Sequence, residues 1–85
     1  MRTGLNSDVT GNDGKVYHVQ TEDGGIANPV VRTRLFSKGV LLSSQNTSYA
    51  YLLDRDDVEV IVLQIMKDQH ATVIRELSGG GDAKS

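Results

Sequence analysis

The feature that most constrains this fold is a stretch without glycine or proline at residues 56–77, which is also the richest in large apolar side chains. Its apolar residues recur at the three- and four-residue spacing of an amphipathic helix. Ser78 and three glycines follow, and glycine just beyond the last periodic residue is a common helix stop. The sequence therefore predicts one long C-terminal helix, against which the rest of the chain packs.

Three segments ahead of this helix have the alternating pattern of strands, namely residues 16–21, 30–36 and 40–47. Turn residues separate them, with Asp-Gly and Gly-Gly steps after the first and Ser-Lys-Gly after the second. The predicted fold class is α+β, with a three-stranded antiparallel β-meander followed by one long C-terminal α-helix packed on the sheet. Residues 48–53 are expected to form a short helical turn between the two parts.

Alternation also divides the strand residues between two faces. Tyr17, Val19 and Thr21 share one face of the first strand, and the next strand places alternate residues in the same way. The apolar residues around the second turn, Leu35, Phe36 and residues 40–42, are expected to form one pole of the core.

The ends of the chain are polar and rich in glycine. We therefore expect residues 1–14 to be a disordered N-terminal segment, residues 15–77 to be the domain, and residues 78–85 to be a disordered tail. A domain of about 60 residues is only marginally stable alone. The chain has no cysteine with which to form a disulfide, so self-association is the expected additional source of stability.

Charge and hydropathy restrict the classes of partner. With 9 basic and 11 acidic residues, the net charge of −2 argues against a nucleic-acid partner, which usually requires a basic excess. Neither a secretory leader nor an apolar run long enough for a membrane span is recognisable. The sequence thus favours a cytoplasmic protein with no membrane partner.

The predicted helix has more apolar surface than a small sheet can cover. Its 22 residues span about 33 Å, whereas a seven-residue strand spans only about 23 Å. We therefore expect a homodimer through the helix. The alternatives are that the groove or helix of another protein covers it, or that the chain's own N-terminal segment or the turn at residues 49–53 folds over it. The expected contact residues are Val58, Ile61, Ile65, Met66, Val73 and Ile74.

Candidate catalytic and metal-binding residues are sparse. His18 and His70 could meet between sheet and helix, but no third ligand stands at a spacing typical of a metal site, so they are expected to be one strand-face and one helix-surface histidine. No serine lies in a nucleophile motif and no glycine cluster has phosphate-binding spacing. We expect no enzyme activity, catalytic residue, metal or cofactor.

A basic group accompanies an aromatic residue on the second strand. Arg32, Arg34 and Lys38 flank Phe36, an arrangement that some nucleic-acid-binding sheets use for stacking and phosphate contacts. A solvated outer face explains the pattern better. Anion binding by these three residues is kept as an alternative, in which the chain is a small nucleic-acid-binding module.

Several short motifs resemble a small family of bacterial domains of unknown function. They are HVQTED at residues 18–23, the pair Asn28-Pro29, Thr47-Ser48-Tyr49, and the pair Gln69-His70. The resemblance covers residues 17–77, and Tyr51 departs from it where an acidic residue is expected. It implies a short meander leading to a C-terminal helix and no particular activity.

Taken together, these patterns predict a non-enzymatic protein–protein interaction module that homodimerises through its helix or binds an unidentified protein. A second contact site is expected at His18, Gln20, Glu22 and Asp23.

Overall fold

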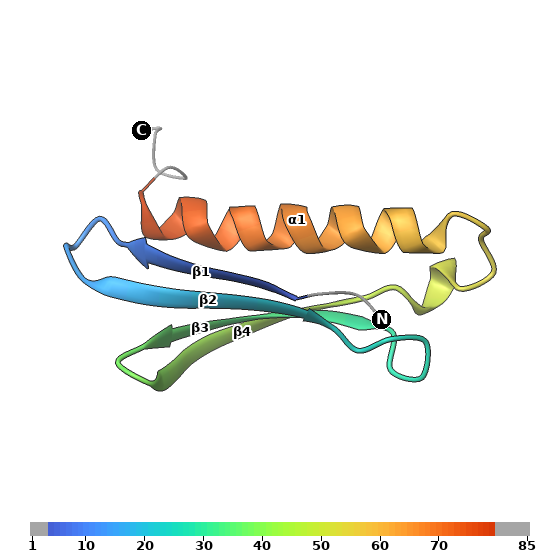
Figure 1. The fold of residues 1–85 in the computed structure, drawn as a ribbon, viewed down its shortest axis with the longest axis horizontal. Helices are drawn as coiled ribbons and strands as arrows, with labels where there is room; N and C mark the ends of the chain where they lie inside the picture. The colour runs from blue at the N-terminus through green and yellow to red at the C-terminus, as the bar shows by residue number, and fades with distance from the viewer. Residues whose placement is uncertain (1–3, 80–85) are drawn as a thin grey trace.

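The computed structural model describes residues 4–79 and has two layers, a sheet and a helix (Figure 1). The sheet contains four antiparallel strands in chain order. They are β1 (Leu5–Thr10), β2 (Val16–Asp23), β3 (Val30–Ser37) and β4 (Val40–Ser48). A short 3-10 turn, η1 (Ala50–Leu52), leads to the helix α1 (Val58–Leu77). The α+β class, the antiparallel sheet and the single helix packed on it agree with the prediction.

The strand β1 corrects the sequence-based prediction in two respects. The sheet has four strands rather than three, and the additional one lies inside residues 1–14, which were expected to be disordered. Its residues alternate between half-buried and exposed, so Leu5, Ser7 and Val9 face the helix while polar residues face outwards. The three inward-facing side chains, which are apolar or small, are enough to make this edge strand amphipathic. Residues 80–85 of the predicted tail lie outside the described part of the chain.

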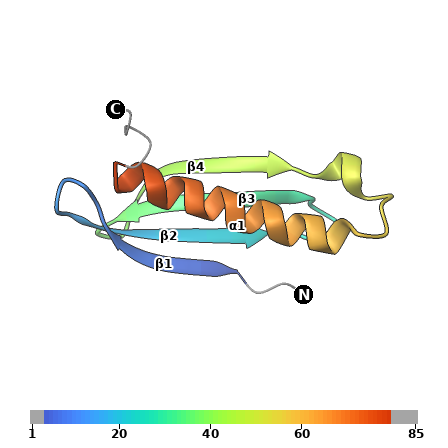
Figure 2. The ribbon, with the colours of Figure 1, turned by 90° about the horizontal axis from the view of Figure 1, so that it is seen from above.

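The predicted division of side chains between the two faces is confirmed for β2 and β3. Val19 and Val31 are fully buried, and Thr21 and Thr33 are nearly so, whereas their neighbours point to the other face. Thr21 and Thr33 are direct partners in the β2–β3 register. The helix packs mainly on β1, β2 and β3. Figure 2 shows it crossing above β2 and β3 at an angle, with β4 beside it.

The core lies at the end of the sheet where β2 finishes, not at the end where it was predicted. Val31, Tyr49, Val62 and Met66 form a buried cluster between sheet and helix. Of the residues expected at the opposite pole, Leu35 and Phe36 are half-buried, whereas Val40, Leu41 and Leu42 are exposed, at 60%, 51% and 52%. The helix covers the first three strands and leaves β4 bare, which is why this apolar run gains no cover.

The β3–β4 connection is a two-residue hairpin loop. Ser37 pairs with Val40, so only Lys38 and Gly39 form the turn, and both have positive φ, at 52° and 79°. Positive φ at both central residues is the geometry of a type I′ turn, whose twist matches that of the flanking strands. Glycine takes this conformation without strain, but the lysine does not.

Helix and sheet are nearly the same length, so the predicted mismatch is smaller than expected. The 20 residues of α1 span about 30 Å, and the nine residues of β4 span about 31 Å. The far end of the helix is held by a hydrogen bond of 2.7 Å from the Asn12 amide, in the β1–β2 turn, to the Leu77 carbonyl. Within residues 4–79, no helix is both long and apolar enough to cross a membrane.

Candidate functional site

A row of polar side chains crosses the interior between sheet and helix. Two consecutive helix residues, Gln69 and His70, point towards the sheet and bind side chains from all four strands. His70 Nδ1 lies 2.8 Å from Thr21 Oγ1, and His70 Nε2 lies 2.9 Å from Ser7 Oγ. Thr21 and Thr33 are joined at 2.7 Å between their hydroxyl oxygens. We call Ser7, Thr21, Thr33, Thr47, Gln69 and His70 the internal polar row.

The direction of the hydrogen bonds in this row follows from Gln69. Its Nε2 donates to two backbone carbonyls that can only accept, Gln45 O at 3.0 Å and Val31 O at 3.3 Å, which fixes the amide orientation. The same nitrogen lies 3.0 Å from Thr33 Oγ1, so this hydroxyl also accepts, and the two hydrogens of Nε2 are shared among the three acceptors. The hydroxyl of Thr47 then donates to the remaining oxygen of Gln69.

The directions of the remaining hydrogen bonds in the internal polar row follow if each threonine hydroxyl donates its proton once. Thr33 donates to Thr21, and Thr21 donates to Nδ1 of His70. The proton of a neutral His70 is then on Nε2 and is donated to Ser7. One continuous chain of donors therefore runs from the Thr47 hydroxyl on β4 to Ser7 on β1.

His70 is held in its neutral form. Its side chain is only 7% exposed, and this burial lowers its pKa from 6.5; repulsion from His18 adds to the shift. The sequence-based prediction of a helix-surface position for His70 is therefore wrong. The reason is that the residue lies between two hydroxyls, and one of them is on the strand that the sequence pattern did not reveal.

The contact between Ser7 and His70 brings a hydroxyl and an imidazole to the distance of a nucleophile and its base. In the assignment above, however, the imidazole donates to the hydroxyl and cannot remove its proton. The other ring nitrogen faces Thr21 rather than a carboxylate, so no negative charge there would stabilise an imidazolium. This geometry suits a structural bond better than an activated nucleophile.

The two histidines lie on opposite faces of the sheet, so they do not come together as the sequence allowed. His18 faces outwards, where its Nδ1 is 2.7 Å from Asp8 Oδ1 and its ring stacks at an angle near Phe36. Within residues 4–79, no three histidine, cysteine, aspartate or glutamate residues are grouped so that they could hold a metal.

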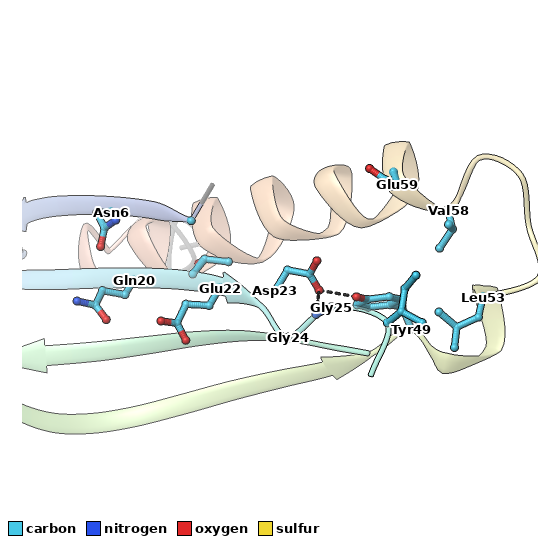
Figure 3. A pocket seen from close by; sticks show the side chains of 13 residues that line it. Asn6, Gln20, Glu22, Asp23, Gly24, Gly25, Tyr49, Leu53, Val58 and Glu59 are labelled. Carbon is cyan, nitrogen blue, oxygen red and sulfur yellow. Dashed lines mark hydrogen bonds between the residues drawn. The ribbon is translucent and has the colours of Figure 1, made fainter. Parts of the chain in front are cut away.

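The stretch at residues 18–23, predicted as a second contact site, has two sides. His18, Gln20 and Glu22 point to the outer face of the sheet, whereas Asp23 turns towards the helix side. Asp23 accepts a hydrogen bond of 2.5 Å from the Tyr49 hydroxyl and another of 3.0 Å from the Gly25 amide (Figure 3). Asp23 therefore fastens the β2–β3 loop to the buried tyrosine that follows β4.

A cleft of about 820 Å³ opens beside this contact, between the end of β2 and the start of the helix (Figure 3). The acidic residues Asp23 and Glu59 line it together with Leu53 and Val58. It adjoins Gly4, the first described residue. The backbone packs closely around Gly24, which lines the cleft, because a Cβ on Gly24 would lie 2.2 Å from the carbonyl oxygen of Asn28.

The basic residues predicted to bind anions lie on β3 and its turn and have acidic and amide neighbours. Arg34 lies 3.5 Å from Glu22, and Arg32 donates a hydrogen bond of 3.0 Å to Asn46. Lys38 is in the exposed β3–β4 turn. Because Asp8 and Glu22 share the outer face with the arginines, this face carries mixed charge rather than a basic patch.

The six helix residues predicted to contact a partner divide into two groups. Met66 and Val73, at 0% and 5% exposure, pack against the chain's own sheet and cannot form an outer surface in this fold. The other four, Val58, Ile61, Ile65 and Ile74, are half-buried. The most exposed apolar residues of the helix are instead Val60 at 71% and Leu63 at 39%.

The longest uncovered stretch of backbone is the outer edge of β4. This strand is last in the sheet order, and eight of its nine residues are exposed. It contains no charged residue and no proline. It begins with the exposed residues 40–42, and the exposed Tyr51 stands just beyond its end.

No protein-family model matches this chain, and none of the curated proteins or solved structures compared with it is a match. The fold and surfaces described above define its class by themselves: a four-stranded antiparallel meander with a helix on one face, one bare edge and a fully bonded polar interior.

The sequence analysis missed the two features on which the site depends, the internal polar row and the bare edge. The motif residues themselves gave a signal, since Thr21, Asp23, Thr47, Tyr49, Gln69 and His70 all make side-chain bonds inside the fold. Residues 5–10 also alternate in the way that a strand does. Only Leu5 and Val9 among them are apolar, so the pattern is weak.

Proposed function

We propose that this chain is a non-enzymatic protein–protein interaction module that forms a homodimer. The observation that supports this most directly is the run of three consecutive apolar residues at 40–42, each more than half exposed. Single exposed apolar residues are common on protein surfaces, but three in succession are unusual unless they have a function. Burial of this run by a partner would stabilise a complex by about 25 cal/mol for each Å² removed from water.

The surface expected to mediate dimerisation shifts from the helix to β4. The helix uses Val62, Met66 and Val73 to cover its own sheet, which leaves Val60 and Leu63 as separate exposed apolar residues. The strand offers its apolar run together with an unpaired row of backbone groups. We therefore place the dimer contact at β4, with the helix as a neighbouring surface.

The internal polar row supports the non-enzymatic part of the proposal. Its histidine is neutral, buried and bonded at both ring nitrogens, and the hydroxyl beside it accepts rather than donates. Such a row resembles the satisfied polar networks that fix how a helix packs on a sheet.

Sedimentation velocity between about 1 and 100 μM tests this proposal, a range that brackets the micromolar affinity of modest interfaces. We expect the apparent mass to rise from that of one 9.2 kDa chain towards twice that value. A Leu41→Ser, Leu42→Ser variant should shift the rise to higher concentration, and a Val60→Ser, Leu63→Ser variant serves as the matched control on the helix. A chain that stays monomeric throughout the range contradicts the proposal.

Nucleic-acid binding through Arg32, Arg34 and Lys38 is the second candidate function. The observation in its favour is the contact of the His18 and Phe36 rings, 6.4 Å between centroids, on the same open face as the arginines. Titration of a labelled single-stranded oligonucleotide at two salt concentrations tests it. Binding that is absent, or that does not weaken with added salt, rules this function out.

A further inference from the structure

We infer that β4 pairs antiparallel with β4 of a second copy of this chain, so that two four-stranded sheets join into one of eight strands. This inference rests on the proposed homodimer and goes further, because it names the edge, the partner strand and its direction. It follows from three properties of β4: its length, its lack of protection and its complementarity to itself.

The two edges of the sheet differ in length and in protection. The edge strand β1 has six residues and carries Asp8 near its middle. In contrast, β4 has nine residues and carries neither a charge nor a proline. Natural proteins usually protect exposed edges with charges, prolines or short strands, because an unprotected edge offers its backbone groups to any other strand. β4 has none of these three devices, although its pairing with β3 is interrupted by a bulge at Leu42, which lies between the partners of Leu35 and Phe36. The regular stretch beyond the bulge, residues 43–48, is therefore the part of the edge that is open to pairing.

The helix does not protect this edge either. It packs mainly on the first three strands, and it reaches β4 through Gln69, which bonds the Gln45 carbonyl and the Thr47 side chain. These bonds lie on the helix side of the sheet, and Figure 2 shows β4 beside the helix rather than beneath its centre. A partner strand can therefore approach in the plane of the sheet.

A second copy fits this edge because β4 is neutral along its whole length. An identical strand can lie against it without bringing like charges together, which is the usual obstacle to pairing across a two-fold axis. The charges on the neighbouring strand β3, Arg32 and Arg34, are engaged by Asn46 and Glu22, and Lys38 lies in the turn at one end of β4, away from Ser44. Two such edges are therefore electrostatically compatible.

A two-fold axis at Ser44, the midpoint of β4, places residues 43–45 of the two copies opposite one another. Residues 46–48 of each copy then extend alongside residues 40–42 of the other, where the bulge at Leu42 interrupts the regular ladder. Tyr51, which is 78% exposed and follows the end of β4, lies near the apolar run of the partner in this arrangement.

Single-cysteine cross-linking tests the pairing sharply, because the chain has no cysteine of its own. Directly opposed residues of antiparallel strands have Cα atoms about 4.5–5.5 Å apart, which is within the range of a disulfide. We would place cysteine in turn at residues 42 to 46, and use Asn6→Cys on the opposite edge as the control. One β4 position should form disulfide-linked dimers fastest, with slower rates on both sides of it. Rates in β4 no higher than for Asn6→Cys overturn the inference.

A charge placed on the axis gives an independent test. Ser44→Lys should weaken the dimer at least about tenfold, because it brings two ammonium groups together across the axis. Asn6→Lys should leave the dimer unchanged, and circular dichroism should show that both variants keep the fold.

The results separate this inference from the proposed function. A wild-type chain that is monomeric at every concentration overturns both. A wild-type dimer that is unaffected by Ser44→Lys overturns the β4 pairing alone, and assigns self-association to another surface such as the helix.

Discussion

The hydroxyl of Thr21 lies 2.8 Å from Nδ1 of His70 and joins the second strand to the helix across 49 residues of sequence. Thr21 is 1% exposed, so water cannot replace either partner. The bond is one link of the internal polar row, in which each threonine hydroxyl donates to one acceptor. A change to any link therefore leaves a buried polar atom without a partner.

Thr21→Val keeps the shape of the side chain but removes the hydroxyl that both Thr33 and His70 use. We expect this variant to lose about 1–3 kcal/mol of unfolding free energy, the typical cost of an unsatisfied buried polar group. Thr10→Val is the matched control, because Thr10 is exposed on β1. Urea denaturation measures both, and equal stability of the two variants would contradict the assigned hydrogen bonds.

Stability should also depend on pH through His70. Burial lowers the pKa of this residue in the folded state from 6.5, so the unfolded chain binds the proton more readily. The contribution of His70 is complete above pH 6.5 and is lost as the pH falls below it, with a slope of at most about 1.4 kcal/mol per pH unit. Urea titrations of the parent and of His70→Gln at pH 8 and pH 5 should show a smaller pH effect in the variant.

The bond between Tyr49 and Asp23 provides a third test. Tyr49 is 1% exposed, and its hydroxyl holds a carboxylate that also binds the Gly25 amide. Tyr49→Phe should therefore cost about 1.5–3 kcal/mol, the usual value of a hydrogen bond to a charged group. Tyr51→Phe should cost almost nothing, since Tyr51 is 78% exposed. Thermal unfolding of the two variants side by side makes the comparison, and similar losses in both would show that the Asp23 contact contributes little.

One substitution in the β3–β4 turn should stabilise the protein. Lys38 has a φ of 52°, a conformation that asparagine adopts more easily than lysine, and Asn-Gly is the preferred pair in this type of turn. Lys38→Asn should raise the free energy of unfolding by about 0.5–1 kcal/mol, a part of the cost of a left-handed residue. Lys38→Ala, which does not relieve the strain, is the control. A lower stability of the asparagine variant would mean that the turn has another geometry.

The strands and helix that sequence patterns could predict are those with strong alternation or helical spacing. Residues 16–21, 30–36 and 56–77 lie within or close to β2, β3 and α1. The strand β1 was missed because its inward side includes Ser7, a polar residue that is half-buried and bonded to His70. A pattern of apolar residues cannot reveal a strand whose inward face is partly polar.

The position of the core was mispredicted for a related reason. Residues 40–42 are as apolar as core residues usually are, and composition alone places them inside. Whether they are covered depends on where the helix lies across the sheet, which local spacing does not specify. Conversely, Tyr49 is among the most buried residues, although its neighbours 48 and 50 are exposed.

The contact between Ser7 and His70 spans 63 residues. It joins β1, the first described strand, to α1, the last described helix. Such a contact cannot form on the ribosome until residue 70 has been synthesised and has left the exit tunnel. Until then β1 and β2 have no helix to cover them, and long-range contacts of this kind slow folding. The sheet therefore stays uncovered until residues 58–77 have emerged, and β1 gains the cover of the helix only then.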